Sequence, residues 1–131
     1  MIRVFTSKIL DEALSKDERL ELIADFKKYK SGVLPAWFGK DVLYDHPYNL
    51  DIIKLEQVRH IHLATHGVGF PLFIAQVKRT SDIHLVYCQG FSNKNCYLLM
   101  AILQPNAHAL ARSNQIMYKL GLMAEAFRQK F

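Results

Sequence analysis

The chain has 131 residues, of which 50% are hydrophobic and 22% are charged, so it can bury one core and is not intrinsically disordered. No apolar run approaches the roughly 18 residues of a membrane-spanning helix, and acidic residues replace the apolar segment of a secretory signal near the N-terminus. Two cysteines are too few for a disulfide framework. We therefore expect a single cytoplasmic domain over residues 1–131 that makes no contact with a membrane.

The net charge of +5 lies entirely in the second half of the chain. Residues 1–60 contain equal numbers of acidic and basic residues, whereas residues 61–131 contain seven basic residues against only Asp82 and Glu125. Four of the six histidines, including His66, also lie in this half. A one-sided basic balance indicates a polyanionic partner such as nucleic acid or an acidic protein, although a solvated basic surface explains it equally well.

The first half of the chain predicts one strand and one clearly delimited helix. Alternating apolar residues predict a short strand over residues 1–6. Ser15 and Glu18 form a capping box, in which a hydroxyl and a carboxylate satisfy the free amides of a first helical turn, so we expect a helix over residues 15–31. The following stretch, residues 33–56, indicates irregular connection with a short helix over its last eight residues.

The second half predicts several strands. A strand over residues 58–64 would place His60 and His62 on one face, opposite Ile61. After a break over residues 66–71, three strand-like runs are separated by short polar turns and predict an antiparallel meander. These runs are residues 72–78, 83–89 and 96–103.

The chain is expected to end in a helix over residues 108–130. Five apolar residues recur at steps of three and four and would cover the sheet: Ile116, Leu120, Met123, Phe127 and Phe131. A different face would carry His108, Arg112, Gln115 and Lys119. This order of elements predicts the α+β class, with a compact antiparallel β-sheet flanked by an N-terminal helical segment and a long C-terminal helix.

The first candidate for chemistry is the pair His60 and His62. On one strand face their rings would lie about 6–7 Å apart, because alternate residues are two rises of about 3.3 Å apart. Two imidazoles can converge on one metal ion, but no third ligand follows at a recognisable spacing. Half-buried histidines that bond to backbone groups are the more ordinary interpretation.

The second candidate is a cluster across the turn predicted between two strands: Lys78, Arg79, Asp82 and His84. Phosphodiester cleavage needs a cation that stabilises charge on the phosphoryl oxygens and an imidazole that moves protons. Asp82 could orient a histidine or pair with Arg79. An exposed polar turn with one ion pair is the alternative without a function. The absence of Walker, Rossmann and nucleophile-elbow motifs excludes most nucleotide-dependent enzymes.

Several segments distributed along the chain carry a recognisable pattern: Arg3–Phe5, Gly32–Pro35, His60–Ala64, Arg79–Gly90, Leu98–Leu103, Pro105, His108, Leu110–Arg112 and Met123–Arg128. In these segments the chain resembles the YafO family of bacterial toxins. The similarity covers essentially the whole chain, and the stretch from Arg79 to Gly90 is its most specific part.

The resemblance implies the toxin half of a type II toxin–antitoxin pair. Such toxins are ribosome-dependent mRNA interferases that a small antitoxin silences, and they are related to the RelE-like toxins. RelE-like enzymes cleave without a metal: the RNA 2′-hydroxyl attacks the adjacent phosphate and leaves a cyclic phosphate and a free 5′-hydroxyl. This chain has His84 where many RelE-like toxins have an arginine, and it ends in a long helix rather than in a short catalytic segment.

We therefore expect a RelE-like endoribonuclease that needs neither metal nor cofactor. The candidate catalytic residues are His60, His62, Lys78, Arg79, Asp82 and His84. The two cations would hold the scissile phosphate, the imidazoles would act as general base and acid, and the carboxylate would orient one imidazole. Three further residues would bind RNA backbone, ribosomal RNA or antitoxin: His108, Arg112 and Lys119.

The expected partners are the cognate antitoxin, the ribosome and mRNA, and the antitoxin should be small and acidic. Two alternatives remain open. A non-catalytic toxin could block translation or bind another protein, and it would leave the message intact. A metal-dependent hydrolase could use His60 and His62, and chelators would then abolish its activity.

Overall fold

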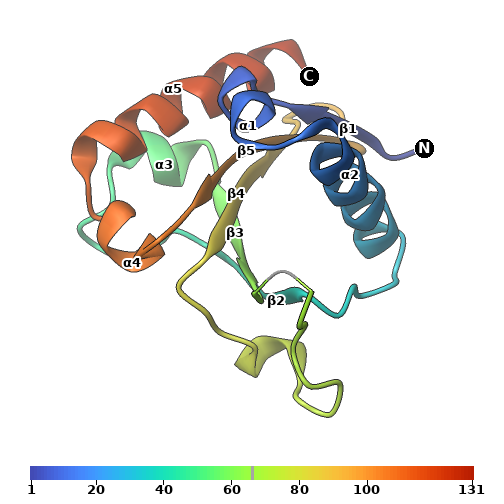
Figure 1. Ribbon diagram of the computed structural model, residues 1–131. Coiled ribbons are helices and arrows are strands. Elements are labelled where there is room, and N and C mark those ends of the chain that lie inside the picture. Colours follow the sequence, from blue (N-terminus) through green and yellow to red (C-terminus); the bar gives the residue numbers. More distant parts are fainter. Residues whose placement is uncertain (66) are drawn as a thin grey trace.

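A five-stranded mixed sheet forms the centre of the molecule, with helices on both of its faces (Figure 1). The computed structural model describes residues 1–65 and 67–131; His66, which the sequence assigns to a break between strands, lies outside the described residues. The sheet order is β1-β5-β4-β3-β2, in which β1 is parallel to β5 and the other pairs are antiparallel. The strands are β1 (Arg3–Thr6), β2 (Phe38–Leu43), β3 (Arg59–Leu63), β4 (His84–Gln89) and β5 (Cys96–Leu103).

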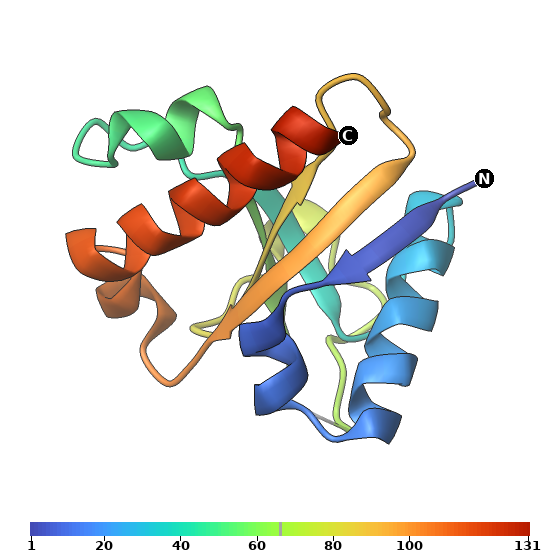
Figure 2. The ribbon, with the colours of Figure 1, turned by 90° about the horizontal axis from the view of Figure 1, so that it is seen from above.

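The helices divide between the two faces of the sheet, as Figure 2 shows for α2 and α5. On one face, Leu10 of α1 and Phe26 of α2 are fully buried in a first core. On the other face, Ile53 of α3 and Ala124 of α5 are fully buried in a second core. The helices are α1 (Lys8–Ala13), α2 (Lys16–Lys30), α3 (Asp51–Leu55), α4 (Ala107–Leu110) and α5 (Asn114–Lys130), and the short 3₁₀ turn η1 spans Gln76–Lys78.

Four strands agree with the sequence predictions, namely β1, β3, β4 and β5. The expectation of a wholly antiparallel sheet is wrong, because α1 and α2 carry the chain across to the far edge and leave β1 parallel to β5. The predicted strand over residues 72–78 is also wrong. That segment is a loop that ends in η1, and Leu72 and Phe73 are 79% and 90% exposed. The sheet instead contains β2, which lies where the sequence predicts irregular connection.

The helix prediction is confirmed where a local capping motif fixes the first residue of the helix. Ser15 and Glu18 form both hydrogen bonds of the capping box at the start of α2. The unpredicted α1 is capped by Ser7, whose hydroxyl accepts a hydrogen bond from the amide of Leu10. The expected continuous helix over residues 108–130 is wrong: the Ser113 hydroxyl accepts from the amide of Ile116 and starts α5 as a separate helix.

The alternation of β3 decides where polar chemistry lies in the fold. Ile61 and Leu63 point into the core beneath α1 and α2, so His60 and His62 lie on the opposite face, as predicted. The register of β3 and β4 then sets His84 directly opposite His62. In the described part of the chain, no helix combines the length and apolar character that crossing a membrane requires.

Candidate active site

Three histidines from two neighbouring strands form a compact group, which we call the imidazole cluster: His60 and His62 of β3 and His84 of β4. The ring of His84 lies 4.4 Å from that of His60 and 4.5 Å from that of His62, measured between centroids. All three residues are at most 7% exposed. The sequence predicted the pair on β3, and the strand register adds the third imidazole.

Two neighbours hold the rings of the imidazole cluster in place. Tyr44, immediately beyond β2, stacks on His60 with ring centroids 3.9 Å apart, and its hydroxyl lies 3.0 Å from Nδ1 of His84. Nδ1 of His62 lies 2.8 Å from both the carbonyl oxygen and the amide nitrogen of Ser81. Tyr44 was not singled out from the sequence, because its contacts follow from the unpredicted strand β2.

An aspartate–histidine pair stands at the exposed edge of the imidazole cluster. Asp82 accepts hydrogen bonds from Nδ1 of His108 at 2.6 Å and from its backbone amide at 2.9 Å. The backbone and side-chain hydrogen bonds from His108 lower the pKa of the Asp82 carboxyl. A carboxylate on Nδ1 orients an imidazole and leaves Nε2 free for a substrate. The ring of His108 lies 5.0 Å from that of His84, and its side chain is 64% exposed.

Burial keeps the imidazole cluster uncharged. Desolvation, reinforced by repulsion from the neighbouring histidines, lowers the pKa of His60 to about 2 and that of His84 to about 4. Burial also lowers the pKa of His62, against the opposing effect of its bond to Ser81. The cluster therefore offers neutral nitrogens at neutral pH, and positive charge for a phosphate must come from another residue.

A cavity of about 190 Å³ opens over these groups. His60, His84 and His108 contribute to its wall, together with Tyr44 and Arg112. The exposed Arg112 supplies a cation there, and its guanidinium lies 5.8 Å from the ring centroid of Tyr48. The described lining thus combines proton-transfer groups with one cation, Arg112, and one carboxylate, Asp45.

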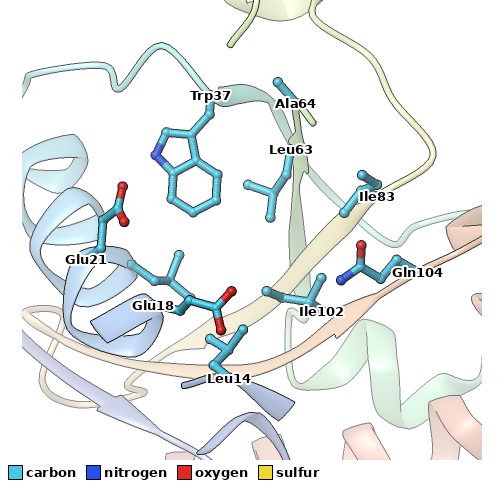
Figure 3. A pocket seen from close by; sticks show the side chains of 10 residues that line it. Leu14, Glu18, Glu21, Trp37, Leu63, Ala64, Ile83, Ile102 and Gln104 are labelled. Carbon is cyan, nitrogen blue, oxygen red and sulfur yellow. The ribbon is translucent and has the colours of Figure 1, made fainter. Parts of the chain in front are cut away.

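A second cavity, of about 110 Å³, lies beside α2 and is mainly apolar (Figure 3). Trp37, Leu63 and Ile102 are among its lining residues, with the carboxylates of Glu18 and Glu21 beside them. Neither an imidazole nor a cation belongs to the described lining. A polyanionic substrate is therefore better accommodated by the cavity over the imidazole cluster.

The predicted turn cluster of Lys78, Arg79, Asp82 and His84 is not assembled as expected, because residues 72–78 do not form a strand. Lys78 is exposed on η1. Arg79 is 5% exposed, and its guanidinium donates to the carbonyl oxygens of Ile74 at 2.9 Å, Phe38 at 3.4 Å and Leu72 at 3.5 Å. Neither residue lines the cavity, and the exposed Lys119 on α5 lies outside its lining as well. Arg79 thus ties the loop to β2 through these carbonyls, and its catalytic role stays a prediction.

Replacing Arg79 by alanine is expected to lower the free energy of unfolding by about 1.5–3 kcal/mol, because carbonyl oxygens lose a charged donor. The adjacent Lys78→Ala variant is the matched control and should stay within about 0.5 kcal/mol of wild type. Urea unfolding followed by circular dichroism measures both changes. If Arg79→Ala instead left the stability unchanged but abolished cleavage, Arg79 would have a catalytic role.

The structure also identifies the residues that could hold a metal ion. One ligand atom from each of His60, His62 and His84 lies within 4.8 Å of the other two. The sequence offered only the two histidines of β3 and no third ligand. His84, 22 positions further along the chain than His62, completes a three-imidazole donor set.

Comparison with known proteins places the chain in one family. Residues 26–129 match the family described as toxin YafO of type II toxin–antitoxin systems. A protein of Escherichia coli (strain K12) named mRNA interferase toxin YafO is 49% identical over 132 residues, which cover 99% of this chain and 100% of that protein. No solved structure matches the chain. Both matches confirm the resemblance seen in the sequence motifs, and the chain therefore belongs to the YafO toxin family of type II toxin–antitoxin systems.

Proposed function

We propose that this toxin is an endoribonuclease that cleaves mRNA on the ribosome, with the cavity over the imidazole cluster as its active site. The observation that carries the proposal is the Asp82–His108 pair, whose histidine stands beside buried imidazoles and lines the same cavity as Arg112. The 49% identity to a protein named mRNA interferase toxin supports the same activity.

In the proposed reaction the RNA 2′-hydroxyl attacks the adjacent phosphorus, and the bond from phosphorus to the 5′-oxygen breaks. One imidazole takes the proton of the 2′-hydroxyl, and a second gives a proton to the departing 5′-oxygen, so the products are a cyclic phosphate and a 5′-hydroxyl. His108 and His84 are the best-placed pair for these two roles, and Arg112 would stabilise charge on the phosphoryl oxygens. Asp82 would hold His108 and stabilise its protonated form.

The partners form part of the same proposal. An antitoxin would silence the toxin, the ribosome would present the message, and the protein would act in the cytoplasm, where translation takes place. A relationship to RelE-like toxins is supported in outline by the mixed sheet, with α1 and α2 on one face and α5 on the other.

Primer extension on a defined message in a purified translation system tests the proposal, with and without ribosomes. A chelator selective for transition metals should be present, so that the Mg²⁺ needed by the ribosomes remains. Discrete new 5′ ends that require ribosomes are expected. Intact message with translation stopped would instead indicate a toxin that acts by binding.

Arg112→Ala is expected to weaken RNA binding and to make it less sensitive to salt. For single-stranded RNA, each lost phosphate contact reduces the slope of log affinity against log salt by about 0.7. Binding of a 2′-O-methylated message fragment, which cannot be cleaved, gives this slope. Lys28→Ala on α2 is the control for loss of one exposed charge and should leave the slope near that of wild type. The same measurement on Lys119→Ala tests whether that lysine also contacts RNA.

A further inference from the structure

The imidazole cluster contains more nitrogen lone pairs than its hydrogen bonds use. His60, His62 and His84 are 7%, 5% and 1% exposed. Among the residues that the structure describes, Nδ1 of His60 and Nε2 of His84 are buried and have no hydrogen-bond partner. Buried polar atoms are normally paired, and an unpaired one calls for an explanation such as a bound ion. Two such atoms in adjacent rings point to a shared ligand.

The spacing of the three imidazoles suits one small cation. Their ligand atoms lie within 4.8 Å of one another. A tetrahedral zinc ion with Zn–N bonds of about 2.0–2.1 Å holds its nitrogens roughly 3.4 Å apart. The rings therefore need to approach one another by at most about 1.4 Å, which small side-chain rotations can supply.

The neighbours of the imidazole cluster resemble an outer coordination shell. Metal-bound histidines usually donate their second ring N–H to a carbonyl, carboxylate or similar acceptor, which fixes the orientation of the ring. The Ser81 carbonyl lies 2.8 Å from Nδ1 of His62, and the Tyr44 hydroxyl lies 3.0 Å from Nδ1 of His84. The Ser81 amide also lies 2.8 Å from Nδ1 of His62 and donates to it, so this ring would exchange that bond for one to the carbonyl on binding the ion. With Nδ1 then protonated in both rings, each Nε2 would present a lone pair to the ion. The cavity above His60 and His84 would leave a further coordination position accessible to solvent.

We propose that His60, His62 and His84 bind one divalent transition-metal ion of the zinc class, and that this ion silences RNA cleavage. Imidazole nitrogens suit Zn²⁺, Cu²⁺ and Ni²⁺, whereas Mg²⁺ and Ca²⁺ prefer oxygen ligands. A coordinated nitrogen can neither take nor give a proton, so the ion would remove His84 from acid–base chemistry. The silencing rests on the proposed function, but the binding site itself does not.

Binding is tested on the full chain after chelator treatment, by calorimetric titration with Zn²⁺ and by the visible absorption of Co²⁺. One ion per chain is expected. Loss of an outer-shell partner weakens metal binding by about 10–100-fold, and Tyr44→Phe should fall within that range. His62→Gln and His84→Gln each remove a ligand and should weaken binding further. The control is Lys28→Ala, since Lys28 is exposed on α2 and does not line the cavity; it should bind as wild type does. Circular dichroism and thermal melts identify any variant that fails to fold.

Absence of saturable binding to the wild-type chain would overturn the metal site, and so would unchanged affinity in folded His62→Gln and His84→Gln. In the cleavage assay, Zn²⁺ should slow wild-type cleavage reversibly. Cleavage that requires the ion would overturn the silencing. A chain that binds one Zn²⁺ through these histidines but cleaves no RNA in either state would refute the proposed function and leave the metal site standing.

Discussion

Replacing His108 by alanine is expected to slow mRNA cleavage by about 10²–10⁴-fold, the usual contribution of one positioned acid or base. His108 is the exposed imidazole of the site, and Asp82 holds its Nδ1 at 2.6 Å. Its side chain is 64% exposed, so its loss leaves no cavity in the core and the fold should be retained. Quantitative primer extension under single-turnover conditions gives the rate, and thermal melts check the fold.

The matched control is Gln115→Ala, which removes an exposed and uncharged side chain near the start of α5. It should cleave as wild type does. Asp82→Asn should reduce the rate less than His108→Ala, because it removes the group that orients the imidazole but keeps the imidazole itself. Wild-type cleavage by a folded His108→Ala chain would remove this residue from the mechanism.

Replacing Asp41 by alanine is expected to destabilise the protein by about 3–5 kcal/mol, because two tyrosine hydroxyls lose a charged acceptor and each such hydrogen bond contributes about 1.5–3 kcal/mol. The Asp41 side chain is 9% exposed and accepts hydrogen bonds from the hydroxyls of Tyr29 and Tyr87 and from Nε of Arg59. Lys30 adds an ion pair at 3.8 Å. Without the carboxylate, Tyr87, which is fully buried, loses its acceptor, and two cations lose their counter-charge. Urea unfolding measures the loss.

The control is Glu12→Ala. Glu12 forms a 4.0 Å ion pair with Lys8 in which both side chains are largely exposed. Such pairs contribute about 0–1 kcal/mol, so this variant should unfold close to wild type. If Asp41→Ala lowered the free energy of unfolding as little as Glu12→Ala, the groups around Asp41 would have found other partners. Because this network lies on the α2 face of the sheet, Asp41→Ala should act on stability rather than on the cleavage rate of the folded chain.

Local patterns were sufficient wherever the determining contacts lie within a few residues. The capping box of Ser15 and Glu18 predicted the start of α2, because both of its hydrogen bonds form within one turn. The alternation of β3 predicted that His60 and His62 share a face, because that face depends only on strand geometry. The same locality explains the split C-terminal helix. The apolar steps begin only at Ile116, after the break, and the Ser113 hydroxyl caps α5 within its first turn.

Patterns failed where distant chain segments decide the structure. The apolar run over residues 72–78 suits a strand, but β2 takes the edge position beside β3 instead. The surroundings of Arg79 also depend on distant segments: the fold buries its guanidinium against the carbonyls of its own loop and of β2, and its role at a phosphate stays a prediction. Burial and edge pairing depend on which segments meet, and a single sequence does not state this.

The sequence by itself determined the family, the presence of a central sheet with a C-terminal helical region, and the two histidines on one strand face. The tertiary structure decided which other side chains lie beside those histidines. The register of β3 and β4 sets His84 opposite His62. Tyr44, which follows β2, stacks on His60. Asp82, in the turn before β4, pairs with His108. Each of these contacts links residues far apart in the chain. They form because the sheet buries its apolar faces in only one register, and no local periodicity encodes that choice.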